Sequence, residues 1–145
     1  MRRWSDIAIL TFAWLAAGSL ARPEDKALPP PAKGPLTLHV LNTTTGKPAV
    51  GVSVRLERQA DQRWVELGKG RTDANGRLGG LYPPDQRLQA GVYRLVFETG
   101  AYFHAQGQKT FFPRVEVVFE VDREDEHYHV PLLLSPFAYS TYRGS

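Results

Sequence analysis

The side chains best suited to acid–base chemistry in this 145-residue sequence are its four histidines, His39, His104, His127 and His129. Imidazole titrates near neutral pH, so it can both accept and donate a proton there. His39 and His129 each lie in a run of alternating residues, which predicts a β-strand with the histidine opposite the aliphatic side chains. His104 lies in the candidate helix and His127 at a strand edge beside Asp125 and Glu126, and we interpret both as solvated. Taken singly, each histidine is also explained by an ordinary surface or structural role.

Arg77 is the cationic side chain with the most suggestive position. It directly follows the segment 72–76, Thr-Asp-Ala-Asn-Gly, whose residue types favour a tight turn. Arginine presents a planar fork of donors, which suits a substrate with adjacent acceptor oxygens or a delocalised anion. A plain surface arginine remains the alternative for this residue alone.

Sequence signals for other catalytic and metal sites are missing. The chain has no cysteine, which excludes disulfides, thiolate metal sites and cysteine nucleophiles. His127 and His129 would project from one strand face and could begin a zinc site, but no third ligand follows at a recognisable spacing. The Gly-x-Ser-x-Gly turn of serine hydrolases and the phosphate-binding glycine motifs do not occur. We therefore predict neither a metal nor a cofactor.

Strands and turns account for almost all of the chain beyond Pro35. Period-two alternation and β-prone composition predict strands, while Asn-, Gly- and Pro-rich segments predict the turns between them. The segment 101–108 has few β-branched residues and is the candidate for one short helix. Short strands at this spacing predict an all-β fold, a two-sheet antiparallel sandwich of seven to eight strands. The predicted strands are 36–42, 52–57, 64–68, 91–97, 115–121, 128–134 and 137–142.

Pro131 lies inside one of these predicted strands. Because proline cannot donate a ladder hydrogen bond, it predicts an edge strand or an irregular start. Exposed edges are commonly covered by assembly into an oligomer.

The N-terminal residues have the pattern of an export signal. Arg2 and Arg3 precede a short apolar stretch, and Ser19-Leu20-Ala21 offers small residues for signal peptidase. We predict a signal peptide at 1–21, a flexible proline-rich linker at 22–35 and a folded domain at 36–145, hence an exported, periplasmic protein without a membrane segment after cleavage. An uncleaved membrane anchor is the alternative.

Net charge is only +3. A nucleic-acid-binding protein needs a basic stripe or patch, and the charges here are scattered. We therefore predict no nucleic-acid partner.

Four stretches, in matching order and spacing from about Leu36 to Ser145, together resemble the transthyretin-related 5-hydroxyisourate hydrolases. The vertebrate hormone carrier of the same fold departs from the terminal Tyr-Arg-Gly-Ser and lacks counterparts of His39, Arg77 and His129. The four stretches are 38–42 with 46–49, 72–77, 129–136 and 142–145.

This resemblance implies a transthyretin-like fold and an activity. Family members hydrolyse 5-hydroxyisourate to 2-oxo-4-hydroxy-4-carboxy-5-ureidoimidazoline in urate degradation, by attack of water on a ring amide and without a cofactor. They form homotetramers, dimers of dimers, with active sites in the channel between dimers. The residues carried over fall into a catalytic set and a substrate-binding set. The catalytic set is His39, Arg77, His129 and Ser145, and the substrate-binding set is His39, Arg77, Tyr142, Arg143 and Gly144.

The residue types fit that chemistry. Water is a poor nucleophile and an amide nitrogen a poor leaving group, so one imidazole can take a proton from water while another returns one. We expect His39 and His129 to share this work, with Arg77 stabilising charge on the attacked carbonyl. Ser145 and Tyr142 would position substrate or water. Which histidine is the base stays open.

Two other functions fit parts of the sequence. The first is an exported transthyretin-like protein that binds a small ligand without catalysis. The second is an exported sandwich module for carbohydrate or protein contact, using an aromatic platform built from Trp64, Tyr93, Tyr102 and Phe103.

Overall fold

A computed structural model describes residues 34–145 of the chain. The predicted signal peptide at 1–21 and the predicted linker up to residue 33 lie outside the described residues. The first strand begins at Leu36. Within the described part, no helix is long and apolar enough to cross a membrane.

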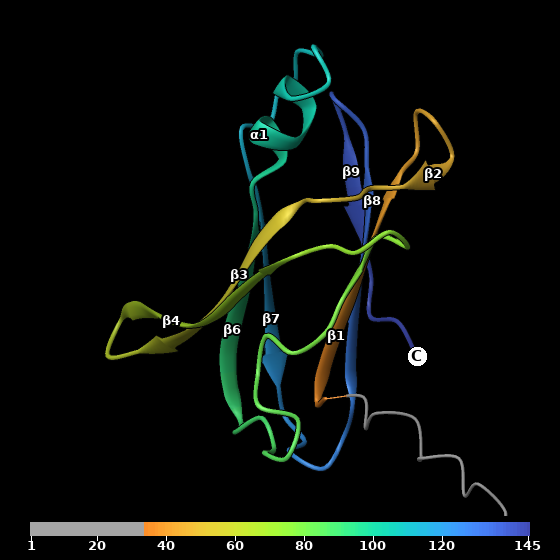
Figure 1. Ribbon diagram of the computed structural model, residues 1–145. Coiled ribbons are helices and arrows are strands. Elements are labelled where there is room, and N and C mark those ends of the chain that lie inside the picture. Colours follow the sequence, from red (N-terminus) through yellow and green to blue (C-terminus); the bar gives the residue numbers. More distant parts are fainter. Residues whose placement is uncertain (1–33) are drawn as a thin grey trace, which may run out of the picture. The chain divides into compact units, whose positions relative to one another are not determined.

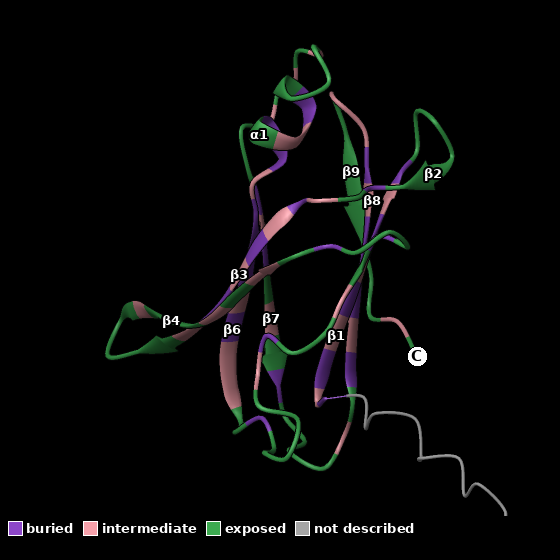
Figure 2. Ribbon diagram, in the orientation of Figure 1, coloured by how far each residue is buried: buried purple, intermediate pink, exposed green. Residues whose placement is uncertain are grey.

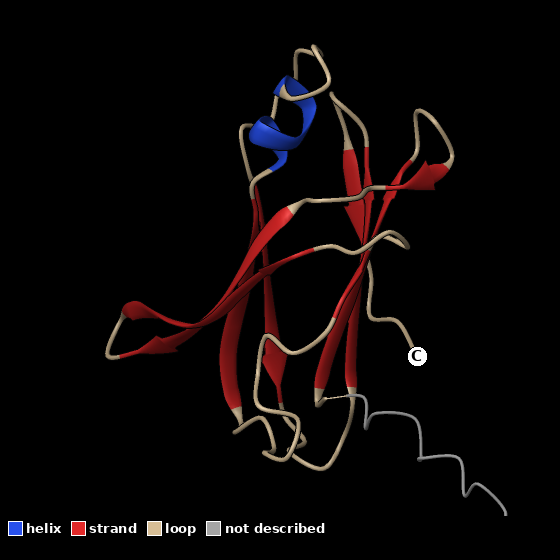
Figure 3. Ribbon diagram, in the orientation of Figure 1, coloured by secondary structure: helices blue, strands red, loops and turns tan. Residues whose placement is uncertain are grey.

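The described chain forms two β-sheets and one short helix, as Figures 1 and 3 show. The five-stranded sheet has the order β2-β1-β8-β9, and β5 also pairs with β1; the four-stranded sheet has the order β4-β3-β6-β7. The first sheet contains β1 (Leu36–Asn42), β2 (Lys47–Pro48), β5 (Arg77–Leu78), β8 (Tyr128–Leu134) and β9 (Tyr139–Thr141). The second contains β3 (Ser53–Ala60), β4 (Arg63–Arg71), β6 (Gly91–Phe97) and β7 (Val115–Val121), and α1 (Thr99–His104) follows β6.

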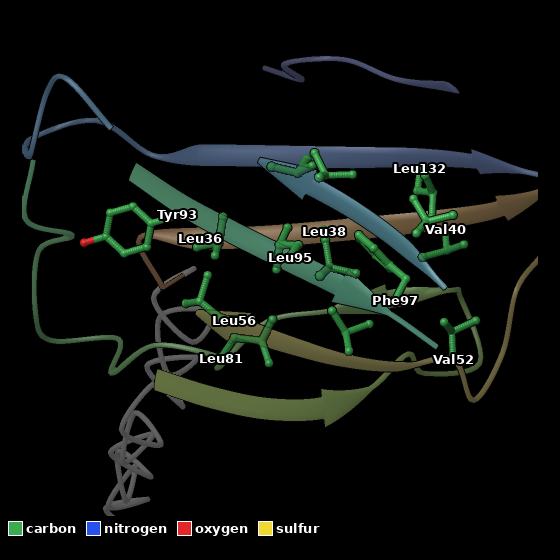
Figure 4. Packing of buried hydrophobic residues seen from close by; sticks show 14 of the residues in the cluster. Leu36, Leu38, Val40, Val52, Leu56, Leu81, Tyr93, Leu95, Phe97 and Leu132 are labelled. Atoms are coloured by element: carbon green, nitrogen blue, oxygen red, sulfur yellow. The ribbon is translucent and has the colours of Figure 1, made fainter. Parts of the chain in front are cut away.

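Aliphatic side chains from both sheets form a common core (Figure 4). Along β1, buried Leu36, Leu38 and Val40 alternate with partly exposed residues, as the period-two pattern predicts. Burial is concentrated in β1, β3, β6 and β8, while β2 and β9 are exposed throughout (Figure 2). Tyr93 and Phe103 are fully buried, so the surface aromatic platform considered from the sequence is wrong.

The two-sheet sandwich with one short helix is confirmed, with three differences of detail. Two strands of only two residues, β2 and β5, raise the count to nine among the described residues. One pair, β1 with β8, is parallel. The helix spans 99–104 rather than 101–108, and its C-terminal end comes early because Gly107 takes a left-handed conformation at φ +69° and closes the turn that follows.

The edge position predicted from Pro131 is wrong, because β8 lies between β1 and β9. The carbonyl of His129 accepts a bond from the Gly144 N–H, on the side of β8 that faces the C-terminal segment. Backbone groups two residues apart in a strand point the same way, so the Pro131 nitrogen faces that segment too. The segment leaves regular pairing after Thr141, and the missing N–H therefore costs no ladder bond.

A charged network crosses the outer face of the four-stranded sheet. Glu57, which is only 8% exposed, accepts a bond of 2.7 Å from Nε of Arg94. The same guanidinium bonds Glu116 at 3.0 Å and stacks on the Trp64 ring at 4.4 Å from its centroid. Arg94 thus compensates a carboxylate that is nearly removed from water.

Replacing Arg94 with alanine should therefore lower the free energy of unfolding by about 2–3 kcal/mol, because Glu57 would keep its burial and lose its main partner. Arg114 is the matched control, since its side chain is 59% exposed although it also pairs with Glu116. Arg114→Ala should cost less than about 1 kcal/mol. Urea unfolding of both variants measures the difference, and equal losses would contradict the role given to Arg94.

Candidate active site

Strand pairing brings His39 and Arg77 directly opposite each other. β5 pairs with β1 in the register His39 with Arg77, on the edge of β1 away from β8. Side chains at opposed positions of an antiparallel pair lie about 4.5–5.5 Å apart at Cβ and on one face of the sheet. That face is the outer one, because the neighbouring Leu38 and Val40 point into the core.

The turn before Arg77 is held by Asp73 and Gly76. A side-chain oxygen of Asp73 accepts bonds from the backbone N–H of Asn75 at 2.8 Å and of Arg77 at 2.9 Å. Gly76 has φ +70°, and a Cβ there would lie 2.5 Å from the carbonyl oxygen of Val40. The turn at 72–77 therefore packs closely against β1, and this contact fixes the backbone position of Arg77.

His129 enters the same outer face from β8. It pairs with Thr37 of β1, which lies two residues before His39 and on the same face of the sheet. On its other side, the Gly144 N–H donates to the His129 carbonyl at 2.8 Å. Gly144 packs so closely that an added Cβ would lie 2.5 Å from Cδ2 of the His129 ring. The C-terminal segment is therefore anchored against His129 by its backbone.

Thr37 links two histidines. Its hydroxyl lies 2.9 Å from Nδ1 of His129 and 2.9 Å from Nε2 of His127. Nδ1 of His127 in turn lies 2.9 Å from the carbonyl oxygen of Gly34. His127 is exposed, as the sequence predicted, but it belongs to this hydrogen-bonded chain.

These side chains border one open cavity of about 760 Å³ on the outer face of the five-stranded sheet, here called the outer cleft. Arg77, His129 and Ser145 line it together, and His39 lies close enough to influence the charge of both His129 and Asp73. Its wall consists of Gly34, Thr37, Leu38, Asp73, Arg77, Leu78, Gly79, Gly80, Pro84, His127, His129 and Ser145.

The pKa values of two groups in the outer cleft, His129 and Asp73, are both lowered, which favours a neutral imidazole and an ionised carboxylate. Burial lowers the pKa of His129, and the nearby positive or protonatable Arg77, His127 and His39 lower it further, with hydrogen bonding to Thr37 acting against them. The two backbone N–H bonds from Arg77 and Asn75 lower the pKa of Asp73. At neutral pH the cleft therefore holds a neutral His129 imidazole and an ionised Asp73.

Two of the sequence-predicted residues lie elsewhere. Tyr142 and Arg143 line a separate hollow beside β7, which His129 also borders. The Arg143 guanidinium pairs with Glu126 and stacks 5.1 Å from the centroid of the Tyr128 ring. The structure thus gathers His39, Arg77, His129, Gly144 and Ser145, and directs Arg143 away from them.

Sequence reasoning missed Thr37 and His127 as members of the site. Both stand two residues before a histidine that it did select, and period-two alternation places residues so spaced on one strand face. That spacing was visible in the sequence. The hydrogen bonds were not, since they depend on the parallel pairing of strands about 90 residues apart.

The polar side chains of the cleft suit proton transfer and anion binding rather than metal binding. Among residues 34–145, no group of three His, Cys, Asp or Glu side chains is placed to hold a metal ion. Its histidines can move protons, and its arginine can bind an oxygen-rich or anionic group.

The model of the HIUase/Transthyretin family matches residues 36–144, which include both sheets and every residue of the site except Gly34 and Ser145. The chain belongs to this family. The family name joins HIUase with transthyretin, so membership alone does not decide between the two.

Curated relatives in the HIUase/Transthyretin family point the same way. The chain is 49% identical to the 5-hydroxyisourate hydrolase of Salmonella dublin over 110 residues, covering 76% of this chain and 80% of that protein. It is also 49% identical to the 5-hydroxyisourate hydrolase of Mus musculus over 113 residues, covering 77% and 95%.

Solved structures of the family include both functional types. Klebsiella pneumoniae 5-hydroxyisourate hydrolase superposes with a TM-score of 0.66 at 39% identity, covering 76% of this chain and 97% of that one. Sea bream transthyretin in complex with thyroxine gives a TM-score of 0.71, also at 39% identity, covering 76% and 94%. The overall fold therefore does not distinguish the hydrolases from transthyretin, so the distinction must come from the side chains of the outer cleft.

Proposed function

We propose that the chain hydrolyses 5-hydroxyisourate in urate degradation. The observation that carries the proposal is that Arg77 and His129, from two different strands, line the outer cleft, with His39 paired directly opposite Arg77. Curated 5-hydroxyisourate hydrolases at 49% identity support the substrate. A passive binding site has no need of a neutral imidazole beside a guanidinium, whereas hydrolysis of a ring amide uses both.

The arrangement supports a division of labour between side chains. His129, neutral at neutral pH, takes a proton from water as the oxygen attacks the ring carbonyl. Arg77 binds the carbonyl oxygen and stabilises the negative charge that develops there. The ring C–N bond then breaks, and the proton that His129 removed from water passes through His39 to the leaving nitrogen. Ser145, on the wall of the cleft, supplies a hydroxyl that positions substrate or water.

The substrate-binding set taken from the sequence needs one adjustment. Gly144 contributes through its backbone contact with His129. Tyr142 and Arg143 lie along the other side of the C-terminal segment, and we propose that they hold this segment in place rather than touch the substrate.

Generating 5-hydroxyisourate with urate oxidase tests the activity directly. Its absorbance decays spontaneously, and the purified chain should accelerate that decay in proportion to enzyme concentration. A decay rate unchanged by the chain would contradict the proposal and favour the ligand-binding alternative.

Hydrolysis should show an acid limb that reports His129. The groups facing it are Arg77 from β5, His39 from β1 and His127 from the loop directly before β8, all of which favour the neutral ring, as does burial. The base must be neutral, so kcat/KM should be lost as pH falls through a pKa below the ordinary value of 6.5. Asp73, whose pKa is lowered, stays ionised across this range. A profile from about pH 5 to 8 checks this, and a midpoint above 6.5 would contradict it.

We also propose that the chain assembles as a homotetramer, a dimer of dimers. Strands β7 and β9 end their sheets and leave backbone edges unpaired within residues 34–145. Apolar side chains beside these edges are exposed, among them Val118 at 57% and Phe137 at 71%. Native mass spectrometry should give four times the mass of the chain, and a monomer at micromolar concentration would contradict this.

Export to the periplasm is proposed on the sequence of residues 1–21 alone, which lie outside the described part. Expressed with its own N-terminus, the protein should fractionate with the periplasm and begin at Arg22. Intact-mass measurement separates this outcome from a retained, uncleaved segment.

A further inference from the structure

Thr37, His127 and the Gly34 carbonyl form a hydrogen-bonded chain that ends on Nδ1 of His129. All three links are 2.9 Å long. The chain lies along the wall of the outer cleft, where Thr37, His127 and His129 are all lining residues. Neither His127 nor Thr37 has a part in the steps proposed above.

The direction of each hydrogen bond follows from the groups involved. A backbone carbonyl only accepts, so Nδ1 of His127 must carry the proton that bonds Gly34. Nε2 of a neutral His127 is then a lone pair, and it accepts the hydroxyl proton of Thr37. With that single proton donated, the Thr37 oxygen accepts from Nδ1–H of His129. The fixed end at Gly34 thus sets the polarity of all three bonds.

We propose that Thr37 and His127 are positioning residues that hold the proton of His129 on Nδ1 and so keep its Nε2 lone pair free for the reacting water. The inference rests on the proposed hydrolase function and names the nitrogen that acts in it. A histidine whose proton sits on the nitrogen facing the water cannot accept another there. The lowered pKa of His129 agrees with a neutral ring of this kind.

The hydrogen bonds from His129 through Thr37 to His127 can also carry a proton away from His129. As Nε2 of His129 takes a proton from water, its Nδ1–H bond breaks and the proton passes to the Thr37 oxygen. The Thr37 hydroxyl proton moves at the same time to Nε2 of His127. His127 becomes an imidazolium that still donates to Gly34, His129 stays neutral, and the hydroxide adds to the carbonyl. Reversal of these transfers releases the proton from Nε2 of His129, which passes through His39 to the leaving nitrogen, and the starting state is restored.

Thr37→Val and Thr37→Ser form a matched pair of variants that test the hydrogen-bonded chain between His127 and His129. Valine keeps the branched shape and removes the hydroxyl, while serine keeps the hydroxyl. Thr37→Val should lower kcat about tenfold or more with KM within about twofold, because the loss concerns proton transfer and not binding. Thr37→Ser should restore most of kcat. Wild-type kcat in Thr37→Val would overturn the inference.

His127→Gln extends the test, with His104→Gln as its control because His104 is exposed on α1. His127→Gln should lower kcat and His104→Gln should leave it unchanged. Residues that act through one chain are not independent, so adding His127→Gln to Thr37→Val should cost little more than Thr37→Val alone. If the two losses of kcat multiply in the double variant, the two residues act independently, and the proposal that they act through one hydrogen-bonded chain is wrong.

Nitrogen-15 NMR of the side chains measures the tautomer without substrate. In the neutral wild-type protein, Nδ1 of His129 should carry the proton, and Thr37→Val should shift the population towards Nε2–H. A wild-type Nε2–H form would overturn the inference whatever the activity. Absence of 5-hydroxyisourate hydrolysis together with the Nδ1–H form would instead contradict the proposed function and leave the tautomer assignment standing.

Discussion

Replacing His129 with asparagine should lower kcat by about 10²–10⁴-fold, the contribution typical of a general base. Asparagine keeps a planar polar group of similar reach but has no nitrogen that takes a proton near neutral pH. His129 borders the outer cleft, has a lowered pKa and hydrogen-bonds Thr37 through one ring nitrogen only. It is therefore the imidazole best prepared to act as the base.

The structural consequences of this change should be small. The backbone carbonyl of residue 129 would still accept from Gly144, and the core side chains of β8 would be untouched. Unfolding temperature and native mass should match the wild type. His104→Asn, on the exposed helix, is the control and should keep full turnover. Wild-type kcat in His129→Asn would remove His129 from the chemistry and leave His39 as the base.

Much of the fold follows from the sequence because a strand's pattern is local. The alternation of Leu36, Leu38 and Val40 identifies both the strand and its buried face without knowledge of any partner. The turn before Arg77 is equally local, since Asp73 and Gly76 serve it with their own backbone and side-chain geometry. These parts of the site could be predicted for that reason.

Pairing between distant strands could not be predicted in the same way. Pro131 favoured an edge strand, but the position of β8 depends on β1 and on the C-terminal segment. The parallel pairing of β1 with β8 sets Thr37 beside His129 and thereby draws in His127. Arg143 shows the reverse, because a partner on another loop, Glu126, turns its side chain away from the cleft.

The C-terminal Tyr-Arg-Gly-Ser gains a physical explanation from the structure, and Gly144 is its centre. The resemblance pointed to these four residues together, although chain ends are usually frayed. Here the Gly144 backbone pairs with His129, and the absence of a side chain lets the segment lie against the imidazole ring. The glycine is required by space, and not by an unusual backbone conformation.

Gly144→Ala should accordingly lower kcat/KM about a hundredfold, the order of loss that follows when a reacting group is displaced by about 1 Å. The new methyl would lie 2.5 Å from Cδ2 of His129 and 3.1 Å from Cγ of Pro131. The proline is buried within β8 and the segment is bonded to the strand, so the His129 ring is the group that must move.

Gly79→Ala is the control for Gly144→Ala, because it adds the same methyl to the wall of the same cleft. Its Cβ would meet only Cγ2 of Thr37 at 3.8 Å, an ordinary contact, so kcat/KM should stay within about threefold of wild type. Both variants should unfold near the wild-type temperature, since neither glycine belongs to the core. Equal activity in the two variants would mean that the C-terminal segment yields to the methyl and that the position of the His129 ring does not depend on it. A selective loss in Gly144→Ala, together with shifted side-chain resonances of His129, would instead tie catalysis to the fit between one glycine and one imidazole.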